Sequence, residues 1–230
     1  MLANPNDLMQ ALHRLYERAH KVCPFKRADV RVRRVGGVIV ASPIEDVFAG
    51  YVCASFPRNR RMRVFINPTI NIGNNGRARK PDIVICTKAG RGDYRLVHIL
   101  EIKADTGHMR TRREIRNKCL RNARKLCARL NSVDEFEFKD TRGEDITVKV
   151  VIPVKVDVVI MTSRNNAKGR IEDICEEIRQ CDDECVKMVV LTNDLLFDRM
   201  NADNVARPLV KWFEFMMERI SVSLKQLNGI

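Results

Sequence analysis

The spacing of apolar side chains along the chain predicts helices and strands in alternation. Residues 6–22 repeat apolar positions at helical intervals and predict an opening helix, whereas the stretch DVRVRRVGGVIVAS predicts a hairpin with one basic face. A capping-box pattern at 42–45, Ser-Pro-Ile-Glu, predicts a short helix that runs to about Phe56. The stretch RMRVFINP after it predicts a strand.

The middle of the chain predicts a second hairpin followed by a basic helix. A Gly/Asn-rich basic loop at 67–80 leads into strands expected near 81–87 and 94–103, which the turn KAGRGD joins. Residues 109–130 then predict a basic helix, whose apolar stripe is formed by Ile115, Leu120, Ala123, Leu126, Cys127 and Leu130. Beyond this helix, DITVKVVIPVKVDVVIMTS predicts one or two strands, with a break at Pro153.

This order of elements predicts an α/β fold, with a mixed sheet flanked by helices. The core is expected over residues 1–165. Residues 166–230 are expected to form a mostly helical extension, with room for one more strand in VKMVVLT. A dense apolar set around Trp212 predicts that this extension packs on the core or forms a homodimer interface.

The charge is distributed unevenly along the chain. Residues 1–130 carry 28 Lys and Arg beside 10 Asp and Glu, whereas residues 131–230 carry 14 basic and 19 acidic residues. The basic first part predicts contact with a polyanion. No apolar run approaches the roughly 20 residues of a membrane span. The first residues also lack the apolar stretch of a secretion signal, so a cytoplasmic protein without membrane contact is expected.

Eight cysteines are many for a chain of this length. No CxxC pair and no close Cys/His cluster supports a zinc site. Cys53 and Cys86 lie in apolar runs, where buried free thiols are expected. Intracellular disulfides remain open as an alternative.

Charged residues stand at one end of the second predicted hairpin. Alternate residues of a strand share a face, so Glu101 and Lys103 are expected on one face with Val97, and His98 on the other. Antiparallel pairing places the start of one strand opposite the end of the next, which brings Asp82 within reach of Glu101. His98 is therefore expected in the core and not in a catalytic role.

Such a cluster of charges suits a hard cation. The carboxylates of Asp82 and Glu101 and the backbone carbonyl of Ile102 are oxygen ligands of the kind that Mg²⁺ takes. A bound metal ion acidifies a water molecule and neutralises charge on a phosphate. Lys103, one step further along the strand, can orient or deprotonate that water or stabilise the transition state by its charge.

The segment Pro81-Asp82, with Glu101-Ile102-Lys103 beginning 19 residues after Asp82, resembles the motif of the PD-(D/E)XK nuclease superfamily, which includes restriction enzymes and Holliday-junction resolvases. That family's core order of helix, three strands, helix and strand is similar to the order predicted for residues 6–162. The resemblance implies a restriction-endonuclease-like fold and a DNA endonuclease that depends on Mg²⁺ or Mn²⁺. It also implies metal ligation by Asp82 and Glu101 and catalysis by Lys103. Many members add an acid from the first helix, here Glu17, with Glu45 as the alternative.

The surroundings of the 101–103 triplet make the resemblance more specific. Glu137-Phe138-Lys139 is also an ExK triplet, but no Pro-Asp precedes it and its neighbours are acidic. The 101–103 triplet instead follows Pro-Asp and a basic loop, lies in apolar surroundings and precedes a basic helix. The alternative for Glu101 and Lys103 is a surface salt bridge at a strand end.

DNA, either duplex or branched, is the expected partner. Phosphate contacts are expected from basic residues of the loop and of the following helix, namely Arg77, Arg79, Lys80, Arg110, Arg112, Arg113 and Arg116. Because few aromatic residues lie among them, recognition of the backbone or of shape is favoured over base stacking on single strands. Two other functions stay open: a non-catalytic DNA-binding module that has kept the fold, and a scaffolding protein whose basic half binds an acidic protein.

Overall fold

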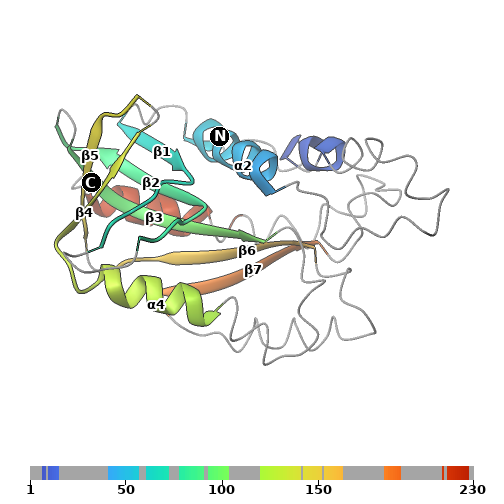
Figure 1. Cartoon of the computed structure of the whole chain (residues 1–230). Helices are drawn as coiled ribbons and strands as arrows, with labels where there is room; N and C mark the ends of the chain where they lie inside the picture. Colours follow the sequence, from blue (N-terminus) through green and yellow to red (C-terminus); the bar gives the residue numbers. More distant parts are fainter. Residues whose placement is uncertain are drawn as a thin grey trace, which may run out of the picture.

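The computed structural model of the chain (Figure 1) describes residues 7–8, 10–15, 41–56, 61–72, 78–90, 93–103, 120–140, 142–151, 153–162, 184–192, 214 and 217–227. Its labelled elements are α2 (Ala41–Ser55), β1 (Met62–Ile66), β2 (Ile83–Lys88), β3 (Asp93–Lys103), α4 (Arg121–Leu130), β4 (Glu135–Lys139), β5 (Asp145–Lys149), β6 (Val156–Thr162) and β7 (Val186–Thr192). Further helical residues lie at 7–8, 10–15 and 217–227. The α/β class and the helix expected near 42–56 are confirmed.

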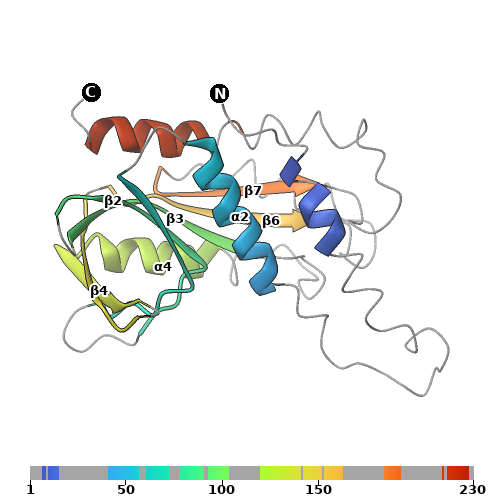
Figure 2. The same cartoon turned by 90° about the horizontal axis from the view of Figure 1, so that it is seen from above.

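Within the described residues, seven strands form one mixed sheet. β1, β2 and β3 pair antiparallel in succession, which confirms the predicted hairpin of β2 and β3. β3 then pairs in parallel with two strands, with β5 through residues 93–95 and with β6 through residues 99–103. β4 continues antiparallel from β5, and β7 continues parallel from β6. The sheet therefore divides at the long strand β3, whose last residues lie between β2 and β6 (Figure 2).

Helices cover both faces of this sheet (Figure 1). α4 packs on one face through the described part of the predicted apolar stripe: Leu120, just before the helix, and Ala123, Leu126, Cys127 and Leu130. On the other face, Phe48 of α2, Leu12 and Ile220 belong to a second buried cluster. Burial of apolar side chains from both helix layers against the same strands holds the three layers together.

A bulge in β3 changes one predicted face. The pairing of β2 with β3 slips by one residue, and Val97 is the extra residue in β3. Val97 consequently packs in the cluster on the α2 side with Leu100, whereas Ile99 packs on the α4 side. The prediction that Val97 shares a face with Glu101 is therefore wrong, because strict alternation resumes only after the bulge.

The strand β4 is missing from the predicted elements although its pattern is regular. Phe136 and Phe138 are buried, and Glu135, Glu137 and Lys139 are exposed, which is the alternation of a strand with one face in the core. The second ExK triplet of the chain thus lies along β4, with both of its charged side chains exposed.

The last part of the chain contributes to the same sheet and core. The stretch VKMVVLT forms β7, and Met217, Ile220 and Leu224 of the helix at 217–227 are buried in the cluster on the α2 side. Trp212 and the hairpin predicted before residue 41 lie outside the described residues. None of the helices that the structure describes is long and apolar enough to cross a membrane.

Candidate active site

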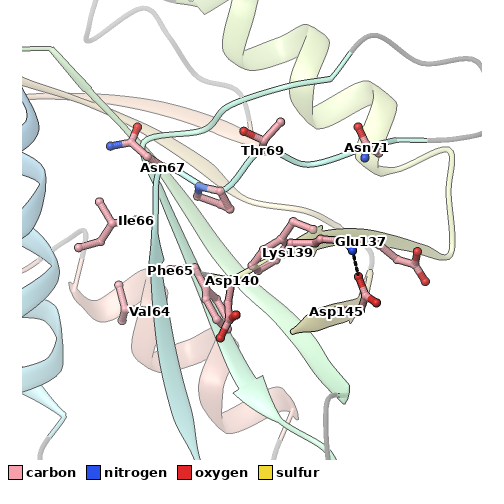
Figure 3. Close-up of a pocket in the computed structure, with 12 residues that line it drawn as sticks. Val64, Phe65, Ile66, Asn67, Thr69, Asn71, Glu137, Lys139, Asp140 and Asp145 are labelled. Carbon is pink, nitrogen blue, oxygen red and sulfur yellow. Dashed lines mark ion pairs between the residues drawn. The ribbon is translucent and has the colours of Figure 1, made fainter. Parts of the chain in front are cut away.

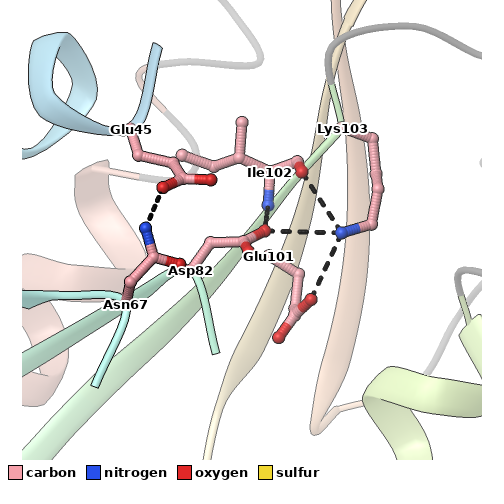
Figure 4. A network of polar contacts seen from close by, with 6 residues as sticks. All are labelled: Glu45, Asn67, Asp82, Glu101, Ile102 and Lys103. Carbon is pink, nitrogen blue, oxygen red and sulfur yellow. Dashed lines mark hydrogen bonds and ion pairs between the residues drawn. The ribbon is translucent and has the colours of Figure 1, made fainter. Parts of the chain in front are cut away.

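Asp82 lies beside Glu101 because β2 and β3 pair antiparallel. Ile83 stands opposite Leu100, so one step outward along both strands places Asp82 next to Glu101. Oδ2 of Asp82 accepts a hydrogen bond from the backbone N–H of Ile102 over 2.5 Å (Figure 4). This bond holds the carboxylate against the end of β3.

Lys103 links the two carboxylates (Figure 4). Its Nζ lies 3.4 Å from Oδ2 of Asp82, 3.3 Å from Oε2 of Glu101 and 3.2 Å from the carbonyl oxygen of Ile102. The side chains are only 34%, 16% and 21% exposed for Lys103, Asp82 and Glu101. These charges therefore form a partly enclosed cluster and not an ion pair on the open surface.

The helix α2 adds a third carboxylate to this region. Glu45, at the start of the second turn of α2, is 6% exposed, and its Oε2 accepts a hydrogen bond from Nδ2 of Asn67, the residue after β1 (Figure 4). The capping-box pattern assigned this carboxylate to the start of its own helix, but α2 begins at Ala41 and Glu45 is bonded to Asn67 instead. Glu17, the first choice for the additional acid, lies outside the described residues.

Burial raises the pKa of two of these acids. For Glu101, burial is the largest cause, the negative charge of Asp82 adds to it, and Lys103 opposes it without cancelling it. Burial is also the largest cause of the raised pKa of Glu45. The hydrogen bond from Asn67 opposes this rise, whereas the negative charge of Asp82 adds to it. Crowded carboxylates of this kind are stabilised by a nearby positive charge.

Lys103 supplies one such charge. Burial alone would lower the pKa of Lys103, but the carboxylates of Asp82 and Glu101 outweigh burial and raise this pKa above its ordinary value. The side chain is therefore an ammonium group at neutral pH. It can donate hydrogen bonds and offset negative charge, but it has no free lone pair with which to accept a proton.

The oxygen atoms of this cluster are of the chemical types that bind a hard divalent cation. Two carboxylates and one backbone carbonyl already surround the positive charge of Lys103, and oxygen atoms of these types are the ligands of Mg²⁺ and Mn²⁺. Within the described ranges, no three His, Cys, Asp or Glu side chains are gathered closely enough to hold a metal ion. A metal site here thus depends on the carbonyl of Ile102 as well as on Asp82 and Glu101.

Two of the predicted phosphate contacts can be placed. Lys80 is exposed, and its positive charge acts on the Glu45 carboxylate, so it lies near the acidic cluster. Arg79 is partly buried, and its main chain pairs with Ile70. The remaining predicted contacts lie outside the described residues: Arg77, Arg110, Arg112, Arg113 and Arg116. The helix α4 exposes four further basic side chains, those of Arg121, Arg124, Lys125 and Arg129.

His98 lies in the core, as predicted, on the face of β3 away from Glu101. It is fully buried, and its Nε2 lies 2.9 Å from Oδ2 of Asp157 in β6, an ion-pair distance without hydrogen-bond alignment. Arg219, from the helix at 217–227, donates a hydrogen bond to Oδ1 of Asp157 over 2.5 Å. The contact of Arg219 with Asp157 joins the helix at 217–227 to β6 of the sheet.

A groove of about 810 Å³ lies next to the cluster (Figure 3). Residues 64–69 and Asn71 line one side, and residues 137–140 with Asp145 line the other. Among the described residues that line it, three are acids and one is basic, Lys139, which pairs with Asp145 over 3.5 Å. The excess of acids among these described residues does not favour a phosphate in the groove. Asn67 lines the groove and also binds Glu45, and it was not among the predicted residues.

Two of the described cysteines, Cys53 and Cys86, are free thiols. Cys86 is fully buried, as expected, and burial raises the pKa of its thiol. Cys53 is exposed, so the expectation that it is buried is wrong. An apolar run in a helix places some of its residues on the outer surface, which the run alone does not reveal.

Comparison with protein-family models, with curated proteins and with solved structures found no match for this chain. The class that the fold defines is an α/β protein with a seven-stranded mixed sheet between helices. A narrower assignment rests on the chemistry of the cluster formed by Asp82, Glu101, Ile102 and Lys103.

Proposed function

We propose that this chain is a Mg²⁺- or Mn²⁺-dependent DNA endonuclease of the PD-(D/E)XK type, which hydrolyses phosphodiester bonds. The observation that carries the proposal is the convergence of Asp82, Glu101, the Ile102 carbonyl and Lys103 at one end of the sheet. The order α2, β1, β2, β3, α4 and β6 supports a restriction-endonuclease-like core, with β4 and β5 inserted before β6.

Each residue of the cluster has a role in this proposal. Asp82, Glu101 and the Ile102 carbonyl would hold the metal ion, and Glu45, the alternative to Glu17, would be the third acid. When bound, the ion would supply a Lewis acid that acidifies water and neutralises phosphate charge. Lys103, as an ammonium group, would donate a hydrogen bond to the attacking water or to a phosphate oxygen and hold it in position.

The basic surface would hold the DNA. Lys80 lies near the cluster, and the exposed basic residues of α4 provide further contacts to backbone phosphates. A homodimer would present two such sites, one for each strand of a duplex or junction.

Cleavage of labelled duplex, four-way-junction and flap DNA in Mg²⁺, in Mn²⁺ and in EDTA tests the proposal. Asp82→Ala and Lys103→Ala are expected to lower the rate by at least about 100-fold, because each removes a group that acts on the reacting atoms. The second ExK triplet provides the matched control. Glu137→Ala and Lys139→Ala remove the same side-chain types from exposed positions on β4 and should leave the rate unchanged.

The outcomes separate the alternatives. Metal-dependent cleavage that is lost in the first pair of variants and kept in the second supports the nuclease, and the preferred DNA substrate defines the subclass. Wild-type protein that binds all three DNA substrates but cuts none of them with either metal contradicts it.

A non-catalytic DNA-binding module is the second candidate, and one observation favours it. Lys103 already offsets the charges of Asp82 and Glu101, as it would in a purely structural ion cluster. DNA binding that is insensitive to EDTA and to Lys103→Ala, without any cleavage, would assign this function.

A further inference from the structure

Asn67 forms hydrogen bonds with both Asp82 and Glu45. It follows β1, and its backbone N–H donates a hydrogen bond to the carbonyl oxygen of Asp82 over 2.8 Å. Its side-chain Nδ2 donates to Oε2 of Glu45 (Figure 4). Asn67 therefore binds the main chain of Asp82 and the carboxylate of Glu45.

The backbone conformation of Asn67 is unusual. Its φ of 52° lies in the left-handed region, and it is the one non-glycine residue with a positive φ in the part of the chain that the structure describes. Asparagine adopts this conformation more readily than other side chains that carry a Cβ. Residues kept in such conformations cluster at functional sites, and here the turn stands where β1 ends beside the acidic cluster.

Glu45 needs a hydrogen-bond donor in this position. Its carboxylate is almost fully buried and feels the negative charge of Asp82, so repulsion favours a rotation of the side chain away from the cluster. A donor on the strand side opposes this rotation. The Nδ2 group of Asn67 is such a donor, since its amide can give a hydrogen bond to the carboxylate without adding charge.

We infer that Asn67 is a positioning residue, which holds the Glu45 carboxylate toward Asp82 and Glu101 before a metal ion binds. This inference rests on the proposed function, because a metal ion gives the orientation of Glu45 its purpose. Asn67 would not touch the DNA or the ion. It would act through Glu45, as partners that orient ligands do in other metal sites.

Two substitutions of Asn67 distinguish the contribution of its side-chain amide from that of its left-handed backbone, and a third substitution is the control. Asn67→Gly keeps the left-handed backbone without strain and removes the amide, whereas Asn67→Ala removes the amide and also strains the backbone. Asn71→Ala is the matched control. It removes the same amide from an exposed residue that lines the same groove, and its backbone N–H can still donate to Glu137.

Binding of Mn²⁺ to the full chain without DNA, followed by the electron paramagnetic resonance signal of the free ion, is the direct test. We expect the Kd for Mn²⁺ to rise about tenfold in Asn67→Gly and Asn67→Ala, at the lower end of the range for residues that orient metal ligands. Asn71→Ala should bind as the wild type does. The Mg²⁺ concentration for half-maximal cleavage should rise in the two Asn67 variants, while the KM for DNA stays unchanged.

Two results would overturn the inference. Wild-type Mn²⁺ affinity in Asn67→Gly with weaker binding in Asn67→Ala would mean that the residue contributes only its turn. Wild-type affinity in both variants would mean that it contributes nothing to the site. Failure of the proposed function looks different, because the wild-type protein would then neither bind Mn²⁺ nor cut DNA.

Discussion

Nζ of Lys103 lies 3.4 Å from Oδ2 of Asp82, which precedes it by 21 residues. The same ammonium group contacts Glu101 and the carbonyl of Ile102, so it occupies the centre of the oxygen set proposed for a metal ion. A divalent cation that binds these oxygens has to displace Nζ, because two positive charges at this distance repel each other. Metal binding at this cluster would therefore be linked to the position of Lys103.

Replacement of this lysine should strengthen metal binding while it abolishes cleavage. Lys103→Met keeps the length of the side chain and removes the charge that competes for the oxygens. We expect the Kd for Mn²⁺ to fall at least about fivefold, which corresponds to roughly 1 kcal/mol for one removed charge repulsion. Isothermal titration of Mn²⁺ into wild type, Lys103→Met and the exposed control Lys139→Met measures it. Weaker binding in Lys103→Met would contradict the linkage.

The buried carboxylate of Glu45 should make stability depend on pH. Its pKa is raised above the ordinary value of 4.5 in the folded protein, chiefly by burial, so the folded state binds this proton more readily than the unfolded state does. The free energy of unfolding contributed by this group therefore falls as the pH rises from 4.5 through the raised pKa. Glu45→Gln removes the charge and retains an oxygen that can accept from Asn67.

Thermal melts in EDTA between about pH 4.5 and pH 7.5 give the comparison. Glu45→Gln should melt at a higher temperature than the wild type at pH 7, and the difference should shrink toward zero as the pH falls to about 4.5. Glu137→Gln, which changes an exposed carboxylate, should show no such trend. If the difference in melting temperature between Glu45→Gln and the wild type did not change with pH, the raised pKa could not be that of Glu45.

Replacement of Arg219 should lower the free energy of unfolding of the protein. Asp157 is fully buried between His98 and Arg219, and Arg219→Met leaves its charge short of one partner. Removal of one member of a buried ion pair costs about 3–5 kcal/mol of unfolding free energy. Urea denaturation measures this loss. Lys225→Met, at an exposed position on the same helix, should change the free energy by less than about 0.5 kcal/mol, and equal losses in the two variants would contradict the role of Arg219.

The exposed face of α4 should contribute to DNA affinity through charge. Replacement of Arg124, Lys125 and Arg129 by alanine should weaken binding to all DNA sequences alike and reduce the salt dependence of log K by about 0.9 for each phosphate that the protein no longer neutralises. Fluorescence anisotropy over a series of salt concentrations measures both effects. The control replaces three exposed lysines on the strands, Lys88, Lys139 and Lys149, and thus removes the same charge. Equal effects in both triple variants would show that net charge alone is responsible.

The pairing of Asp82 with Glu101 was predictable from the sequence because it depends on a local hairpin. The short connection between the two apolar strands brings the start of β2 near the end of β3, and the bulge at Val97 then shifts the register by one residue, so that Asp82 stands next to Glu101. The burial of Leu126 and Cys127 on α4 was predictable for a similar reason, since helical periodicity alone defines the apolar side.

Glu45 was named from the sequence as an alternative acid, but its hydrogen bond with Asn67 was not predictable in the same way. Glu45 lies 22 residues before its partner Asn67 along the chain, and the local pattern assigned it to a helix cap. Which of several acids reaches the sheet depends on how α2 packs over β1, and no local pattern contains that information. The face of Val97 was missed because a bulge inserts one residue into β3, and β-bulges depend on both paired strands.

The sequence by itself determined the α/β class, the hairpin that joins Asp82 to Glu101, and the apolar side of α4. Each of these depends on residues close together in the chain, whose spacing sets which side chains share a face. Only the tertiary structure decided that Asn67 binds Glu45 beside the cluster and that His98 meets Asp157 and Arg219 in the core. Those contacts depend on the packing of whole helices and strands against one another, which the free energy of the complete core determines.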